Sequence, residues 1–87
     1  MEKKLAIHNK LGLHARPAAL LVETASRFEC DITIIKNGLK VNAKSIMGVL
    51  MLAAEIGSEL TIQAKGKDAK EALEALADLF RKKFNED

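Results

Sequence analysis

Segments with two different hydrophobic periodicities alternate along these 87 residues, and the order of the segments limits the folds that the chain can adopt. Apolar and polar side chains alternate in one set of segments, which is the period of a β-strand with one buried face. These segments are residues 4–8, 31–36, 39–43 and 59–65. Apolar side chains recur at helical spacing in the other set, residues 17–28, 46–54 and 68–83. The order βαββαβα predicts an α+β domain whose helices cover the single apolar face of an antiparallel sheet.

Turn and capping residues lie at several of the predicted boundaries. Asn37-Gly38 separates two alternating segments, and both residue types tolerate the positive φ of a type I′ hairpin turn. Ser45 precedes the apolar segment 46–54 and can cap its first turn, while Gly57 suits a left-handed helix terminus. The sequence therefore predicts a hairpin followed by a short capped helix.

The sequence also indicates where the last predicted helix begins. Asp68 and Glu71 have the spacing of a capping box, in which the two side chains bond each other's backbone amides. Asp78 and Lys82 are spaced to pair on the exposed side of the same helix. We therefore expect this helix to run from residue 68 to residue 83.

The composition fits one domain, residues 1–87, because separate cores usually need roughly 100 residues each. The net charge is +2, which is too small to indicate nucleic acid or an anionic membrane as partner. No apolar run approaches the ~20 residues of a membrane-spanning helix, and the first residues lack the apolar core of a signal peptide. Cys30 is the only cysteine, so no intramolecular disulfide can form. We expect a cytoplasmic protein without membrane insertion.

The segment Gly12-Leu13-His14-Ala15-Arg16-Pro17-Ala18 contains the residues best suited to chemistry. His14 stands before a predicted helix, whose first amides lack intrahelical partners and favour an anion. A histidine that is largely neutral at pH 7 keeps a lone pair on one ring nitrogen, so His14 can attack phosphorus. Arg16 offers a planar fork of cationic donors that matches the oxygens of a phosphoryl group. By itself, the pattern leaves open a phosphohistidine site or a solvated surface histidine.

That segment resembles the phosphohistidine signature of the HPr family, the histidine-containing phosphocarriers of the phosphoenolpyruvate-dependent sugar phosphotransferase system. The match has no departures, and the chain length and element order agree with the family over nearly the whole chain. The resemblance implies an open-faced β-sandwich with strand order 1-4-2-3 and helices on one face, a choice that element order alone leaves open. It also implies that His14 accepts a phosphoryl group from phosphorylated enzyme I, with Arg16 as charge stabiliser, and passes it to the A components of sugar-specific enzymes II.

A carrier of this kind is not a free-standing enzyme, and we expect it to be a monomer. We expect no cofactor, because positioning and charge neutralisation suffice for phosphoryl transfer between proteins. No metal site is expected either, since His8 and His14 have no Cys or carboxylate at ligand spacing. Cys30 is expected to pack as a small apolar side chain.

A second segment, Lys44-Ser45-Ile46-Met47-Gly48-Val49, is similar to the regulatory serine region of the same family. Ser45 is therefore expected as a helix N-cap and as a phosphorylation site for HPr kinase/phosphorylase in bacteria with that enzyme, with a transcription regulator as a further partner. The helix after Ser45 lacks a polar stripe, so part of it must stay exposed as a docking patch. The predicted docking residues are Leu20, Ile46, Met47 and Leu50.

Two other functions are open. The nitrogen-related branch of the phosphotransferase system uses a similar carrier, and residues 80–87, ending in Phe84-Asn85-Glu86-Asp87, are faintly similar to it, whereas Ser45-Ile46-Met47-Gly48 favours the sugar branch. A small α+β nucleic-acid-binding module shares the element order. Such a module stacks bases on exposed sheet aromatics, but Phe28 and Phe80 fall in predicted helices, Phe84 directly follows one, and no GxxG loop is present. Nucleic-acid binding is therefore the more distant alternative.

Overall fold

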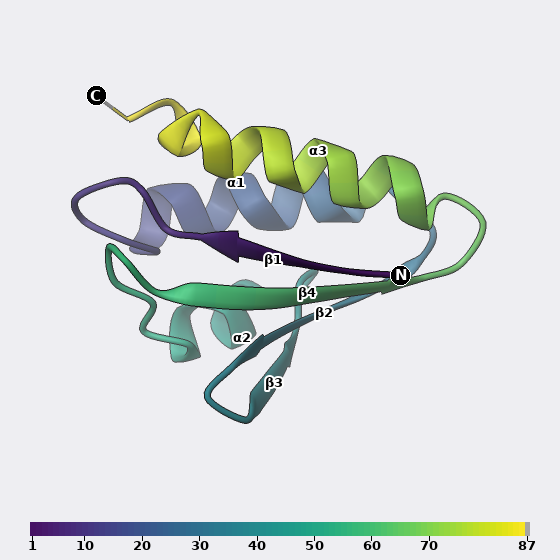
Figure 1. Ribbon diagram of the computed structural model, residues 1–87, viewed down its shortest axis with the longest axis horizontal. Helices are drawn as coiled ribbons and strands as arrows, with labels where there is room; N and C mark the ends of the chain where they lie inside the picture. The colour runs from purple at the N-terminus through teal and green to yellow at the C-terminus, as the bar shows by residue number, and fades with distance from the viewer. Residues whose placement is uncertain (87) are drawn as a thin grey trace.

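The computed structural model describes residues 1–86 of the chain. Its elements are β1 (Glu2–Ala6), α1 (Ala15–Ser26), β2 (Asp31–Lys36), β3 (Leu39–Asn42), α2 (Ile46–Met51), β4 (Glu59–Lys65), α3 (Ala69–Arg81) and a short 3₁₀ helix, η1 (Lys83–Asn85). The strands form one antiparallel sheet in the order β1-β4-β2-β3, and α1 and α3 lie over one of its faces (Figure 1). The predicted open-faced sandwich and its strand order are confirmed.

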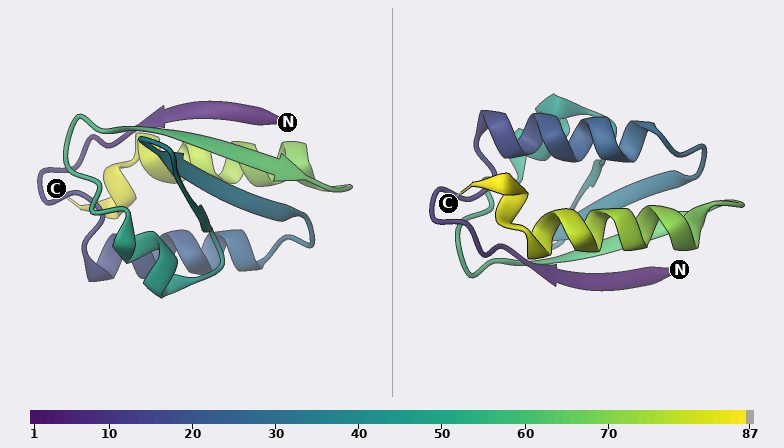
Figure 2. Two further views of the ribbon diagram at one scale, coloured as in Figure 1. Left: turned by 90° about the horizontal axis from the view of Figure 1, so that it is seen from below. Right: turned by 90° about the horizontal axis from the view of Figure 1, so that it is seen from above.

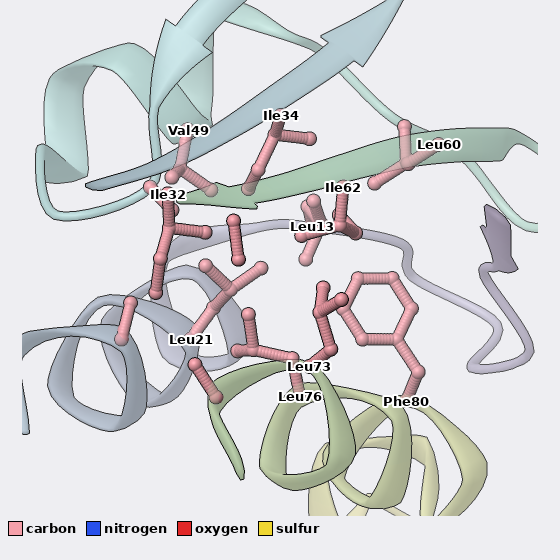
Figure 3. Close-up of a cluster of buried hydrophobic side chains, with 14 of the residues drawn as sticks. Leu13, Leu21, Ile32, Ile34, Val49, Leu60, Ile62, Leu73, Leu76 and Phe80 are labelled. Atoms are coloured by element: carbon pink, nitrogen blue, oxygen red, sulfur yellow. The ribbon is translucent and has the colours of Figure 1, made fainter. Parts of the chain in front are cut away.

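The core lies between the sheet and the helices. Alternate residues of β2 and β4 point inward, and they meet apolar side chains from all three helices and from the loop before α1 (Figure 3). The side chains labelled there are Leu13, Leu21, Ile32, Ile34, Val49, Leu60, Ile62, Leu73, Leu76 and Phe80. No strand of the sheet contains an aromatic residue, so the open face offers no stacking platform for bases.

The chain from β1 to α1 departs from the predicted boundaries. β1 ends at Ala6, and Ile7 is buried beyond the strand, so the strand predicted at residues 4–8 begins and ends too late. α1 begins at Ala15 instead of residue 17 and ends at Ser26 instead of residue 28. Pro17 is therefore the third helical residue, where its missing N–H removes no intrahelical bond.

The end of α2 was also predicted wrongly. The helix stops at Met51, and Ala53 adopts the left-handed conformation with φ 49°. Lys36 on β2 donates to the carbonyl oxygens of Leu52 and Ala53, at 3.0 and 3.2 Å. A side chain far away in the sequence therefore supplies hydrogen bonds to the carbonyl groups at the end of the helix. Gly57, the predicted terminus, instead lies in the turn before β4 with φ 88°. The hairpin prediction is confirmed, because Asn37-Gly38 has φ values of 48° and 85°.

The predicted capping box at Asp68 and Glu71 does not form. Asp68 is the N-cap of α3, but its carboxylate accepts bonds from the Glu29 amide at 2.9 Å and the Cys30 amide at 3.0 Å. These bonds, that from Glu29 above all, lower the pKa of Asp68 because they favour the charged form. Their contribution to stability is therefore present above the ordinary carboxyl pKa and is lost as the pH falls through the lowered one.

α3 itself is shorter than predicted, because it ends at Arg81 rather than residue 83. The predicted pair is confirmed, with Lys82 Nζ 3.1 Å from Asp78 Oδ2, and Arg81 also pairs with Asp78. Among residues 1–86, no helix is long and apolar enough to cross a membrane.

Candidate functional site

His14 lies at the end of the loop that joins β1 to α1. It is the N-cap of α1 in an extended conformation (φ −80°, ψ −171°), and its carbonyl oxygen accepts a 3.0 Å bond from the Ala18 amide. The side chain is 38% exposed and makes no capping bond to the helix. Within residues 1–86, the amides of Ala15 and Arg16 have no backbone partner. The positive end of the helix therefore offers hydrogen-bond donors next to an accessible imidazole.

The loop before His14 is tied to the chain between α2 and β4. The Leu13 amide donates to the Ala54 carbonyl at 2.9 Å, and the Leu13 side chain is buried. Gly12 has φ 67°, and a Cβ at this position would overlap the Ala54 carbonyl oxygen. Glycine is required here both for the backbone conformation and for the close approach, so the register of the loop before His14 is fixed.

The C-terminal segment reaches the same loop. Glu86 Oε2 lies 2.8 Å from His14 Nε2, and Glu86 Oε1 accepts a 2.9 Å bond from the side-chain amide of Asn9. Both views of Figure 2 place the described segment that follows α3 beside the loop after β1. His14 and Glu86 are separated by 72 positions, so no local pattern could have indicated the contact, and the sequence analysis missed both Glu86 and Asn9.

Arg16 is exposed on the first turn of α1, and in the described part of the chain it forms no ion pair. It borders a shallow depression of about 460 Å³ next to the His14–Glu86 contact. The lining residues are Lys10, Leu11, Arg16, Asn85 and Glu86. A cationic fork and an accessible imidazole thus lie at one end of α1, as the sequence predicted.

Comparisons with known proteins identify the family of the chain. The family model described as "PTS HPr component phosphorylation site" matches residues 1–82. The chain belongs to the HPr family. Phosphocarrier protein HPr of Xylella fastidiosa (strain Temecula1 / ATCC 700964) is 48% identical over 87 residues, which are 100% of this chain and 98% of the relative.

Solved HPr structures share the fold. HPr-C-His from Thermoanaerobacter tengcongensis is 49% identical, with a TM-score of 0.97 over 100% of this chain and 98% of that one. A second structure from the same organism, described as an HPr dimer, is 52% identical with a TM-score of 0.81 over 92% of each chain. Since a dimer is recorded for that relative, the expectation of a monomer stays a prediction for this HPr-family chain.

The predicted docking residues of this HPr-family chain are mostly exposed. On α2, Ile46, Met47 and Leu50 are 42%, 66% and 36% exposed, while Val49 is buried beneath them. Leu20 on α1 is half-buried and packs against the core. The prediction that one side of α2 faces outward is confirmed. Other exposed apolar side chains, which were not among the predicted docking residues, are Met1, Leu11, Leu39, Met51 and Ile56.

Ser45 has the capping position expected for an HPr-family chain, because its Oγ accepts a 3.1 Å bond from the Gly48 amide. Cys30 is buried as predicted, and burial raises the pKa of its thiol, so little thiolate is available for chemistry. His8 is exposed just after β1. Residues 1–86 hold no cluster of His, Cys, Asp and Glu that could bind a metal ion.

Proposed function

We propose that this chain is a cytoplasmic phosphocarrier that accepts a phosphoryl group on His14 from phosphorylated enzyme I. It then passes the group to the A components of sugar-specific enzymes II, and it is not an enzyme on its own. The observation that supports the proposal most directly is the accessible His14 ring at the N-cap of α1, next to amides without backbone partners in the described chain.

The residues around His14 suit a phosphoryl group that is held briefly and then released. The Ala15 and Arg16 amides can donate to phosphoryl oxygens, and the helix dipole favours negative charge there. The ring of the buried Pro17 fixes its φ, so it stiffens the first turn. Because the site is exposed, a second protein can reach the phosphoryl group and take it, which a carrier requires.

The test is incubation with enzyme I and labelled phosphoenolpyruvate. We expect acid-labile label on the protein, located on His14 by fragmentation of the phosphorylated peptide. A protein that stays unlabelled would reject the proposal. The labelled protein is then offered to A components from the sugar and nitrogen-related branches. Ser45-Ile46-Met47-Gly48 favours faster transfer to the sugar components, and faster transfer to the nitrogen-related component would support the alternative branch.

Replacement of Arg16 by Ala should slow phosphoryl transfer from enzyme I about 100-fold. Arginines that neutralise charge on a transferring phosphoryl group contribute about 10³–10⁵-fold in closed sites, and the exposed Arg16 should contribute less because solvent screens it. Single-turnover kinetics with phosphorylated enzyme I measure the loss. Arg16→Lys keeps the charge without the planar fork, so its transfer rate should lie between those of wild type and Arg16→Ala.

Arg27 provides the matched control for Arg16, because it is also exposed and lies at the opposite end of α1. Arg27→Ala should transfer phosphate at nearly the wild-type rate. Equal losses in the two variants would show that Arg16 acts through net charge only.

Ser45 is proposed as a regulatory phosphorylation site for HPr kinase/phosphorylase, and Leu20, Ile46, Met47 and Leu50 as part of the docking surface for enzyme I and other partners, a transcription regulator included. Phosphate on Ser45 would place about two negative charges beside exposed Ile46 and Met47. The helix would tolerate this charge at its first turn, but an apolar partner surface would not.

Ser45→Asp should therefore raise the KM of enzyme I for the protein about 5- to 10-fold, since an unpaired charge at an interface costs about 1–2 kcal/mol. Ser45→Ala removes the bond to the Gly48 amide without adding charge. It should lower the free energy of unfolding by about 1 kcal/mol and leave KM nearly unchanged. Equal transfer kinetics for Ser45→Asp and wild type would contradict the proposal.

A further inference from the structure

We infer that Glu86 is a positioning residue for phosphoryl transfer: its carboxylate holds the proton of His14 on Nε2 and faces the positive charge that the ring gains when phosphorylated. The inference rests on the proposed phosphocarrier function and assigns a role within it to the C-terminal segment. The contact on which it depends joins Glu86 Oε2 to His14 Nε2 at 2.8 Å, with the Glu86 side chain 17% exposed.

The hydrogen-bond partners of Glu86 determine which ring nitrogen carries the proton. One oxygen faces His14 Nε2, and the other accepts from the side-chain amide of Asn9 at 2.9 Å. An ionised carboxylate only accepts hydrogen bonds, so Nε2 must be the donor. Nδ1 then keeps the lone pair, and within residues 1–86 it has no hydrogen-bond partner. The contact thus leaves Nδ1 available to attack phosphorus.

Asn9 connects Glu86 to the loop before His14. It is completely buried, and its side-chain nitrogen also donates to the Gly12 carbonyl at 2.8 Å. The opposite amide orientation would place its oxygen against the Gly12 carbonyl and the Glu86 carboxylate, which are both acceptors. Asn9 Oδ1 has no partner within the described residues, although it is buried. Asn9 is therefore held in this orientation by its two donor bonds, and Glu86 is fixed relative to the loop.

The backbone before Glu86 adopts a conformation that its sequence disfavours. Lys83, Phe84 and Asn85 have φ values of 55°, 55° and 61°, in the left-handed region that side chains with a Cβ rarely adopt. Phe84 is 1% exposed, and its ring lies 4.9 Å from that of Phe80. Burial of Phe84 therefore holds the strained turn, and the turn directs Glu86 to His14. Strain of this kind persists only where the surroundings over-determine it.

The chemistry of transfer gives this contact a purpose. The Nδ1 lone pair forms a bond to phosphorus while the bond from phosphorus to the donor's atom breaks, and that atom keeps the electron pair. Because Nε2 keeps its proton, the ring becomes positive, and the Glu86 carboxylate faces that charge. In the next transfer the Nδ1–P bond breaks and its electron pair returns to Nδ1. The leaving group is then a neutral imidazole, which departs more readily than an anionic one.

The first experiment measures the protonation of the ring directly, on the full-length protein. ¹⁵N spectra of the His14 imidazole distinguish the two neutral tautomers. We expect the Nε2–H form in wild type, a mixture in Glu86→Ala, and the Nε2–H form again in Glu86→Gln, whose amide oxygen can still accept. Each variant retains Phe84, so the anchor of the segment is unchanged. Spectra of Glu86→Ala that match wild type would overturn the inference.

The second experiment measures phosphoryl transfer from phosphorylated enzyme I. Loss of a partly exposed charge-assisted hydrogen bond predicts a kcat about 5- to 10-fold lower in Glu86→Ala, with KM changed less than about 2-fold. Glu86→Gln keeps an acceptor without the charge and should lose about 2- to 3-fold. Glu74→Ala, an exposed change on α3, is the matched control and should equal wild type.

The two proposals fail in different ways. Wild-type protein that takes up no phosphate would overturn the phosphocarrier function, while the ¹⁵N spectra still report whether Glu86 holds the proton. Normal wild-type transfer with equal kcat in Glu86→Ala and Glu74→Ala would overturn only the role of Glu86. A rise in KM without a fall in kcat would also overturn it, because Glu86 would then contact the partner instead of orienting the ring.

Discussion

Replacement of His14 by Ala is expected to abolish phosphoryl acceptance from enzyme I, leaving less than about 0.1% of the wild-type rate, because a covalent carrier has no bypass for its nucleophile. The fold should survive the change. The His14 side chain makes no capping bond to α1, and its contact with Glu86 is partly exposed, so the free energy of unfolding should fall by only about 1 kcal/mol. Label uptake and urea unfolding measure the two effects separately.

His8→Ala is the matched control for His14→Ala, because His8 is the other histidine of the chain and is exposed just after β1. It should accept phosphate at the wild-type rate. If His14→Ala were still labelled, or if His8→Ala lost its label while remaining folded, His14 would not be the phosphorylated residue. Acid lability of the label separates phosphohistidine from phosphoserine in either case.

Short-range patterns alone do not determine the strand order of the sheet, and its prediction needed the family resemblance. Alternation correctly predicted strands at residues 31–36 and 59–65, and Asn37-Gly38 correctly joined β2 to β3. Element boundaries were less predictable. β1 contains Lys3 and Lys4 because an edge strand buries little, so its hydrophobic pattern is weak at the start. Helix ends depended on long-range bonds, such as those from Lys36 to the end of α2.

The candidate site also contains residues that short-range patterns indicate and residues that they do not. His14 and Arg16 were predictable because they are close in sequence and both belong to the start of one helix. Glu86 was not, since its position depends on tertiary contacts that no sequence window contains. Phe84 must be buried, and the residues around it must adopt left-handed conformations, before Glu86 can reach His14. Helix propensity gives no sign of such a turn.

Gly12→Ala is expected to lower the free energy of unfolding by about 4 kcal/mol, because the added methyl group meets both a conformational and a steric cost. A left-handed φ of 67° costs a residue with a Cβ about 1–2 kcal/mol. The new Cβ would also overlap the Ala54 carbonyl oxygen, and overpacking against backbone adds about 1–3 kcal/mol or more. Displacement of the Ala54 carbonyl would also weaken the 2.9 Å hydrogen bond that this oxygen accepts from the Leu13 amide.

Gly38→Ala separates the two costs. Gly38 also has a positive φ, 85°, but a Cβ there would meet no atom within 4 Å, so only the conformational cost of about 1 kcal/mol applies. Urea unfolding with unchanged m-values would compare the two variants. Equal losses of unfolding free energy in Gly12→Ala and Gly38→Ala would mean that the loop before His14 accommodates the added Cβ. The close contact between Gly12 and Ala54 would then not position His14. A much larger loss in Gly12→Ala, with slower phosphoryl acceptance by the folded fraction, would show that this backbone contact positions the histidine.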